Sequence, residues 1–346
     1  MQAVHIREHG APDVLDIVDL PRPEPGAGEV LVRVLGVSVN HLDLWVRRGM
    51  PGMPIGMPRI PGCDGTGEIV AMGSGVDDAR LSVGQRVVLE PGYTTQPSAA
   101  VERGEDHLAD DYEIRGEHCD GFAREFVALP ARYVFPLPDG VDPVHGAAVP
   151  LVFVTAWGLL HSRAQVQAGE RVLVVAGSSG VGSAAIQLAK LAGCQVIATA
   201  GSEEKRALCR DLGADEVIDH YDEAWPKAVG AWSAGRGVDV VVEHVGPATW
   251  RGSMGCLARN GRLVTCGGTT GPKVGILLPH LFIKNLSVMG STMGPRKALP
   301  EIYEQIAAGR LRPVVDRVMP LSQVRTAHQL LEDKSVSGKI VLIPGK

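Results

Sequence analysis

Small residues gather between an apolar strand and a helix in the stretch VVAGSSGVGSAAIQLAK, residues 174–190. At such a turn the backbone N–H groups of the helix N-terminus point outward and favour a bound diphosphate. In the pattern GxGxxG, Gly177 makes the turn, Ser179 stands at the second glycine, and Gly182 allows close packing of helix on strand. The sequence therefore predicts a dinucleotide site at Gly177, Ser178, Ser179, Gly180, Val181 and Gly182.

The residue at the end of the strand that follows this helix bears on the choice between NAD and NADP. NAD sites usually carry Asp or Glu there, because a carboxylate accepts hydrogen bonds from both ribose hydroxyls and repels a 2′-phosphate. Here the position is Ala200, followed by Gly201 and Ser202, with the positive charges of Lys205 and Arg206 in the next helix. This pattern favours NADPH. Ser202 also fits a helix N-cap, and a first-turn glutamate that reached the ribose would restore NAD.

The composition limits the class of protein. A chain of 346 residues is long enough for two domains. A net charge of -5 gives no basic surface for nucleic acid or an anionic membrane. No apolar stretch reaches the ~20 residues of a membrane crossing, and the first residues contain no apolar leader, so we expect a cytoplasmic protein. The six cysteines never fall as CxxC, which argues against a disulfide framework and a zinc knuckle.

The pattern of apolar residues changes along the chain. Residues 1–140 contain short β-rich segments separated by Gly and Pro, among them 29–39, 67–73 and 85–91. From residue 171 apolar strands alternate with amphipathic helices, which indicates a parallel sheet covered on both faces. The predicted fold class is α/β, with a β-rich part and a doubly wound parallel sheet.

Several motifs follow one another in a familiar order: GVSVNHLDLWVRRG, GCDGTGEIVAMG, GQRVV, LPDG, VTAW, GSSGVGSAAIQLAK, VVVEHVG, GRLVTCGGTTG and GKIVLIPG. With them the chain resembles the medium-chain dehydrogenase/reductase superfamily over essentially its full length. NHLDLWVRRG and GSSGVGSAAIQ resemble the quinone oxidoreductase and zeta-crystallin branch. The resemblance implies an NAD(P)H-dependent oxidoreductase, with a GroES-like catalytic domain from residues 1–150 and 278–346 and a Rossmann domain from residues 151–277.

The resemblance also identifies the positions that hold zinc in metal-dependent relatives. For the catalytic ion these positions are Asn40, Cys63, Asp64 and Leu151. Only Cys63 and Asp64 could ligate, whereas a catalytic zinc needs three protein ligands. The proton-relay positions hold Leu42 and Trp45, and the positions of the structural zinc hold Thr95, Ser98, Val101 and Ala109. No bound metal is expected, although a zinc-dependent alcohol or polyol dehydrogenase with unusual ligands stays open as an alternative.

Without a metal, a saturated alcohol is a poor substrate, because nothing stabilises its alkoxide. A quinone or an enone is a better hydride acceptor, since its negative charge is delocalised. The resemblance places Asn40, Asp43, Trp45, Arg47 and Thr155 around the nicotinamide and the acceptor. Asn40 either donates to the acceptor oxygen or caps a turn, and Trp45 either stacks on the acceptor or packs in the core. Asp43 and Arg47 are expected to pair with each other at the strand-to-helix junction.

Further cofactor contacts are implied by the same resemblance. His41 would face the diphosphate, and Thr155 would lie near the nicotinamide. The backbone at Val245, Gly246, Cys266 and Gly267 would contact the carboxamide. The positions that contact the 2′-phosphate in the quinone reductase branch are Ser202, Lys205, His220 and Lys334, with His220 standing where the branch has a tyrosine.

The expected partners are a small-molecule acceptor and a second copy of the chain, with neither nucleic acid nor a membrane involved. The stretch KVGILLPHLFIKNLSVMGSTMG, residues 273–294, is unusually apolar for the rim of a sheet. It suggests an edge strand buried at a two-fold interface, and hence a homodimer. A cofactor-binding protein with little catalysis is a rival interpretation from another functional class.

Overall fold

The computed structural model describes residues 1–50 and 52–345, which form two compact units. The first unit contains residues 1–151 and the chain from 295 onward, and the second contains residues 152–294. The resemblance implies that the chain returns to the catalytic domain at residue 278. The second unit instead continues to Gly294, because β15 (Ser287–Gly290) pairs in parallel with β14 (Leu257–Thr265).

The first unit is built around β3, which pairs with β4, β8 and β17 in antiparallel fashion. The seven-stranded sheet has the order β16-β17-β3-β4-β5-β9, with β8 also paired to β3. Two small antiparallel pairs, β1 with β2 and β6 with β7, complete the strands. Their bounds are β1 (Gln2–Ile6), β2 (Leu15–Asp19), β3 (Glu29–Val39), β4 (Asp64–Met72), β5 (Arg86–Leu89), β6 (Gly92–Tyr93), β7 (Glu113–Ile114), β8 (Phe126–Pro130), β9 (Val134–Pro136), β16 (Val315–Pro320) and β17 (Lys339–Ile343).

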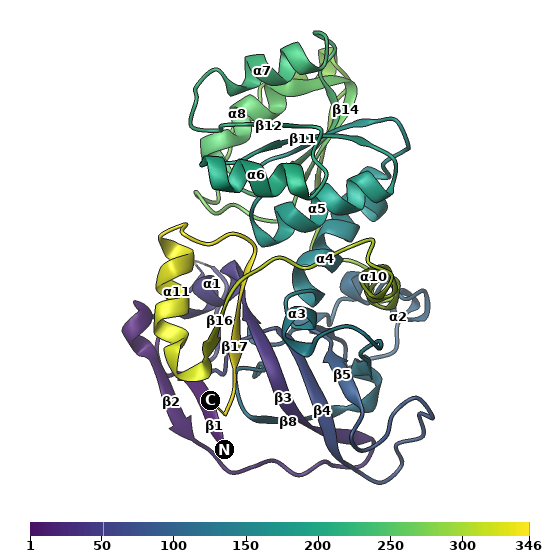
Figure 1. Cartoon of the computed structure of the whole chain (residues 1–346), viewed down its shortest axis with the longest axis vertical. Helices are drawn as coiled ribbons and strands as arrows, with labels where there is room; N and C mark the ends of the chain where they lie inside the picture. The colour runs from purple at the N-terminus through teal and green to yellow at the C-terminus, as the bar shows by residue number, and fades with distance from the viewer. Residues whose placement is uncertain (51, 346) are drawn as a thin grey trace. The chain divides into compact units, whose positions relative to one another are not determined.

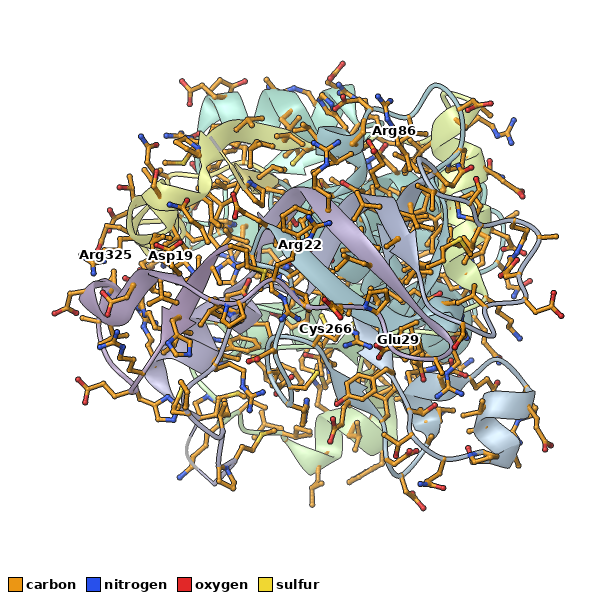
Figure 2. The ribbon with its side chains drawn as sticks, turned by 90° about the horizontal axis from the view of Figure 1, so that it is seen from below. Asp19, Arg22, Glu29, Arg86, Cys266 and Arg325 are labelled. Atoms are coloured by element: carbon orange, nitrogen blue, oxygen red, sulfur yellow. The ribbon has the colours of Figure 1, made fainter. Side chains whose placement is uncertain are left out.

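Helix α1 of the first unit begins where the chain leaves β3. Asn40 directly follows β3 and is the N-cap of α1, with Asp43 completing a capping box. The C-terminal helix α11 packs against α1, and Arg325 of α11 donates to the Leu15 carbonyl and to Asp16 on β2. Figure 2 labels Arg325 and Asp19, the last residue of β2. The bounds are α1 (His41–Arg48), α2 (Ala99–Glu102), α3 (Pro143–Gly146), α4 (Pro150–Trp157, which continues into the second unit), α10 (Ala298–Ala307) and α11 (Val324–Glu332).

The second unit is a six-stranded parallel sheet with the order β12-β11-β10-β13-β14-β15. This is the doubly wound order, in which the switch between β10 and β13 opens the crevice used by dinucleotides. Helices cover both faces of the sheet (Figure 1). The bounds are β10 (Arg171–Val174), α5 (Gly180–Leu191), β11 (Gln195–Thr199), α6 (Glu203–Asp211), β12 (Glu216–Ile218), α7 (Trp225–Trp232), β13 (Val238–Glu243), α8 (Pro247–Cys256), β14, α9 (Leu278–Ile283) and β15.

Each unit has its own apolar core. Valines and leucines of β3, β5, β8 and β17 fill the first, and Leu173, Ile197, Val241 and Leu263 lie in the second with Trp225 and Trp250. The near-continuous β-branched strands of the second unit are buried on both faces, as the sequence pattern indicated. Within residues 1–50 and 52–345, none of the helices combines the length and the apolar character needed to cross a bilayer.

Candidate active site

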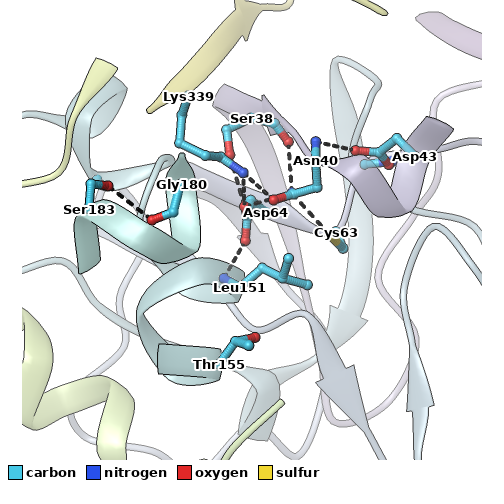
Figure 3. A network of polar contacts seen from close by, with 12 residues as sticks. Ser38, Asn40, Asp43, Cys63, Asp64, Leu151, Thr155, Gly180, Ser183 and Lys339 are labelled. Atoms are coloured by element: carbon cyan, nitrogen blue, oxygen red, sulfur yellow. Dashed lines mark hydrogen bonds and ion pairs between the residues drawn. The ribbon is translucent and has the colours of Figure 1, made fainter. Parts of the chain in front are cut away.

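A buried polar cluster lies where three strands of the first unit meet (Figure 3). Ser38 on β3 lies opposite Asp64, the first residue of β4. On the other side of β3, Val39 pairs with Ile340 of β17, which brings Lys339 beside Asn40. Antiparallel register therefore assembles four polar side chains that are far apart in the sequence.

Asp64 accepts hydrogen bonds from all three of the other polar side chains in this cluster. Its Oδ2 atom lies 2.8 Å from Ser38 Oγ, 2.8 Å from Asn40 Nδ2 and 3.1 Å from Lys339 Nζ. Its Oδ1 atom accepts from the Leu151 backbone N–H at 2.6 Å. Lys339 also donates to Asn40 Oδ1. The carboxylate is thus fully hydrogen-bonded, and its charge is compensated by a buried ammonium group.

The donors at the catalytic metal position do not fit a zinc ion. The Asn40 amide is committed to Asp64 and Lys339, with Cys63 Sγ 3.3 Å from its nitrogen. Burial, with a further contribution from the Asp64 charge, raises the pKa of the Cys63 thiol well above its usual range. Only this sulfur and the Asp64 carboxylate could ligate, whereas a catalytic zinc needs three protein ligands. Leu151 contributes only a backbone N–H. Among residues 1–50 and 52–345, no group of three or more His, Cys, Asp or Glu side chains could hold a metal.

The expected pairing of Asp43 with Arg47 is wrong. Asp43 accepts from the backbone N–H of Asn40 at 2.7 Å and of Gly62 at 2.9 Å, so it ties α1 to the loop that precedes Cys63. Burial raises the pKa of Asp43 to about 6. Arg47 turns the other way and pairs with Glu332 of α11, while its Nε donates to the Gly10 carbonyl. Both residues therefore position α1.

The other residues expected near the acceptor are divided between the units. Trp45 is half-buried on α1, and Asn40 directs its amide nitrogen at Asp64 rather than outward. Thr155 belongs to α4 in the second unit, is buried, and donates to Met293 Sδ at 3.7 Å. His41 is the exposed first residue of α1.

The lobe between residues 91 and 119 is held by polar and aromatic contacts. At the would-be ligand positions, Thr95 donates to Asp111 through its backbone N–H and its hydroxyl, and Ser98 caps α2 by accepting from Val101. The Arg115 guanidinium lies 4.7 Å from the Tyr93 ring centroid and also faces Tyr133. A cation between aromatic rings thus stands at the centre of this lobe.

The predicted phosphate loop lies at the C-terminal end of β10. Ser179 is the N-cap of α5 and accepts from the Gly182 N–H at 3.0 Å. A Cβ atom at Gly182 would lie less than 3.0 Å from the Ala176 carbonyl oxygen, so only glycine fits there. Ser178 is buried, Val181 is partly exposed, and the Gly180 carbonyl accepts from Ser183 Oγ (Figure 3). The loop has the geometry expected for a diphosphate at a helix N-terminus.

His244 joins the phosphate loop to the neighbouring strand. It directly follows β13, across the switch point from β10, and its Nε2 atom lies 3.3 Å from Ser179 Oγ. Burial lowers the pKa of His244, which keeps the imidazole neutral at pH 7. His244 was not among the residues predicted from the sequence, although it lies within the motif VVVEHVG.

Ser202 and His220, which the resemblance assigns to the 2′-phosphate, lie near the end of β11. Ala200 is completely buried, and Ser202 caps α6 by accepting from the Lys205 N–H at 3.3 Å. His220 follows β12 and lies 3.2 Å from Thr199 Oγ1, so this imidazole is held beside the end of β11. Lys334 belongs to the first unit, where it follows α11 with a φ of 56°.

A buried carboxylate organises the ends of β13 and β14. Glu243 accepts from the backbone N–H groups of Val245 and Gly246 and from the hydroxyls of Thr249 and Ser253. The backbone N–H groups of Val245 and Gly246, which were expected to contact the nicotinamide carboxamide, therefore donate to Glu243 within the protein. Cys266 and Gly267 directly follow β14, and burial raises the pKa of the Cys266 thiol to about 12.

Sequence reasoning missed Lys339 and Glu243. Each belongs to a motif that was recognised, GKIVLIPG and VVVEHVG, and each is a charged residue within an apolar strand pattern. A charged residue in a buried strand is rarely tolerated unless it is paired. The presence of a charge in these apolar strands was therefore the signal that could have identified both residues.

Comparison with known proteins agrees with this architecture. Residues 26–139 match the alcohol dehydrogenase GroES-like domain, and residues 180–308 match the zinc-binding dehydrogenase family. A quinone oxidoreductase of Pseudomonas aeruginosa is 33% identical over 353 residues, covering 99% of both chains. The structure of an NAD-dependent alcohol dehydrogenase is similar with a TM-score of 0.95 and 41% identity, covering 100% of both chains.

A further similar structure is that of a mycobacterial protein complexed with NADPH, with a TM-score of 0.83, 30% identity, and coverage of 99% of this chain and 100% of the other. These relatives match the whole length of the chain, and the resemblance noted in the motifs is confirmed. The chain belongs to the medium-chain dehydrogenase/reductase superfamily, in its quinone oxidoreductase-like branch, and is an NAD(P)H-dependent oxidoreductase.

Proposed function

We propose that this oxidoreductase uses NADPH to reduce a conjugated acceptor, a quinone or an enone, without a bound zinc ion. The observation that carries the proposal is the cluster around Asp64. Its carboxylate and the Asn40 amide are joined to Lys339, which leaves Cys63 as the one sulfur donor and an aliphatic side chain at Leu151. These donors would bind zinc weakly, and they support chemistry that needs no Lewis acid.

The reaction class follows from where charge develops. When bound, NADPH supplies a hydride. A quinone or the β-carbon of an enone that takes up hydride becomes a delocalised oxyanion, which water can protonate. A saturated alcohol must instead pass through an alkoxide that needs a nearby cation. The protein then acts mainly by positioning the reactants. The contacts of Asp43 and Arg47 fix α1 and, with it, Trp45. We place Trp45 against the planar acceptor and Thr155 near the nicotinamide.

Two observations bear on the cofactor. The absence of a carboxylate at Ala200, with Ser202 and His220 nearby, supports NADPH. The similar structure named as an NAD-dependent alcohol dehydrogenase favours a second candidate, NAD-dependent oxidation of an alcohol.

The edge of the second unit supports a homodimer. β15 ends the six-stranded sheet and pairs with β14 alone among the described strands. Beside it, Leu277, Leu278, Phe282 and Ile283 are 56–72% exposed. An apolar surface next to an open sheet edge is unfavourable in water, and a second copy would cover both.

The test is a parallel assay of substrate and metal. Protein purified without chelator is analysed for zinc, cobalt and iron by mass spectrometry, before and after dialysis against EDTA. Oxidation of NADPH and NADH is followed at 340 nm with 1,4-naphthoquinone and with a conjugated enone. Reduction of NADP⁺ and NAD⁺ by saturated alcohols is followed at the same wavelength. We expect quinone or enone reduction that EDTA leaves unchanged, with NADPH preferred. Alcohol oxidation that depends on one bound metal per chain would overturn the proposal.

A further inference from the structure

A recess in the first unit contains a carboxylate that the rest of the protein does not use. Residues 53–56 and Arg59 line one side of it, and Glu113, Glu117 and His118 line the other. Its volume is about 130 Å³, enough for several water molecules or for a short side arm of a ligand. Every lining residue belongs to the first unit.

Glu117 faces this recess without a hydrogen-bond donor. The residue is 6% exposed, and among residues 1–50 and 52–345 no group donates to its carboxylate. The nearest candidate is His118 Nδ1, 3.7 Å from Glu117 Oε2. That nitrogen accepts from the Ile114 backbone N–H at 3.1 Å, so it carries no hydrogen to give. The Glu117 oxygens are not fully enclosed, so a ligand that enters the recess could donate to them in place of water.

The charges around the recess favour a cation. Glu113, a second carboxylate of the lining, accepts from the Tyr93 hydroxyl. Arg59 is the positive group of the lining, but it donates to the Gly56 carbonyl and lies 4.0 Å from Asp120. Burial raises the pKa of Glu117, and the neighbouring His118 opposes this shift in part. Met53 and Ile55 add apolar surface that would pack against carbon atoms of a ligand.

The recess adjoins the buried cluster at Asn40 and Cys63. Gly116 packs so closely on Gly62 that a Cβ atom on it would lie 2.9 Å from the Gly62 nitrogen. Gly62 directly precedes Cys63, and it donates its N–H to Asp43. The Glu117 charge is the smallest of the causes, after burial, Asp64 and Asp43, that raise the pKa of the Cys63 thiol. A molecule in the recess is therefore close to the residues that position α1.

We infer that this recess binds the ammonium group of a cationic amine, with Glu117 as the residue that determines specificity. The inference rests on the proposed function in one respect, namely that the amine is a side arm of the acceptor that is reduced. The ammonium donates to Glu117, and its carbon stem lies against Met53 and Ile55. The acceptor preferred by the enzyme would then carry an amine a few bonds away from its conjugated system.

Binding is tested first, without cofactor or turnover. Ligand-observed NMR titrations compare 4-phenylbutylammonium with 4-phenylbutanoate for wild-type protein, Glu117→Gln and the exposed lobe control Glu102→Gln. We expect the ammonium probe to bind wild type and E102Q equally, and E117Q at least about tenfold more weakly, equivalent to ~1.4 kcal/mol. Unchanged binding by E117Q, or equal binding of the anion, overturns the inference. Thermal unfolding of E117Q close to that of wild type shows that the variant is folded.

Turnover is tested second, with two naphthoquinones that carry a 3-ammoniopropyl or an n-butyl arm. We expect kcat/KM at least about tenfold higher for the ammonium compound in wild type and nearly equal values in E117Q. Equal values for both compounds in wild type overturn the assignment of the recess to the acceptor. If the ammonium probe binds as expected but neither these quinones nor the conjugated enone is reduced, the recess stands as an amine site and the proposed function fails.

Discussion

Lys339 Nζ lies 3.1 Å from Asp64 Oδ2, and the two side chains are 4% and 0% exposed. The pair joins the first residue of β17 to the first residue of β4, 275 positions apart in the sequence. Since Asp64 also accepts from Ser38, Asn40 and the Leu151 N–H, this ion pair connects β3, β4 and the start of α4. Its main consequence is that removing one charge leaves the other buried and uncompensated.

We therefore expect Lys339→Met to destabilise the protein strongly. Breaking a buried ion pair by removing one partner costs about 3–5 kcal/mol of unfolding free energy. The double variant D64N/K339M should recover part of this loss, because neither charge then remains. Urea unfolding followed by fluorescence measures the effect, with the exposed Lys297→Met as control, for which a change within about 0.5 kcal/mol is expected. If K339M unfolds at the same urea concentration as K297M, the pair has no structural importance.

Local sequence patterns predicted the phosphate loop and the parallel sheet, because both depend on residues that are neighbours along the chain. The expected pairing of Asp43 with Arg47 at the strand-to-helix junction also joins residues that are close in the sequence. Tertiary contacts decided otherwise, since Asp43 binds the Gly62 N–H and Arg47 binds Glu332, 285 positions away. The Lys339 contacts were missed for the same reason, because strand register between distant segments cannot be read from spacing.

The phosphate loop gives a prediction with a matched control. Gly182→Ala places a Cβ atom against the Ala176 carbonyl oxygen and the backbone of Gly177, so the loop must move. We expect NADPH to bind at least about tenfold more weakly, measured by cofactor fluorescence. Gly230→Ala in α7 adds the same methyl group where nothing lies within 4 Å. It should leave NADPH binding unchanged and stabilise the helix by up to about 1 kcal/mol. Equal cofactor affinity in the two variants would contradict the site.

Glu90 gives the first unit a predicted pH dependence of stability. The side chain is buried against Arg296, and burial raises the pKa of Glu90 to about 7. Because the folded state holds this proton more tightly than the unfolded state, the contribution of Glu90 to stability is greatest below pH 4.5. It is lost as the pH rises toward 7 and beyond.

The comparison of wild type with Glu90→Gln isolates this effect from other titrating groups. Between pH 5 and pH 8, the unfolding free energy of wild type minus that of E90Q should fall by on the order of 2 kcal/mol. Urea titrations at several pH values measure the difference. A difference that stays constant or grows with pH would show that the Arg296 ion pair outweighs burial in setting the protonation of Glu90.

The open edge at β15 leads to a prediction about the assembly. Phe282 is 66% exposed on α9, in the second unit that also contains β15. If a second copy covers this surface, Phe282→Glu places a charge in an apolar interface, and a desolvated, unpaired carboxylate there is unfavourable. We expect wild type to elute as a dimer, and F282E to shift to the monomer mass, in size-exclusion chromatography with light scattering. Val83→Glu, at a position that is 64% exposed in the first unit, should leave the dimer intact. A monomeric wild type at micromolar concentration, or an F282E variant that remains dimeric, would place the interface elsewhere or remove it.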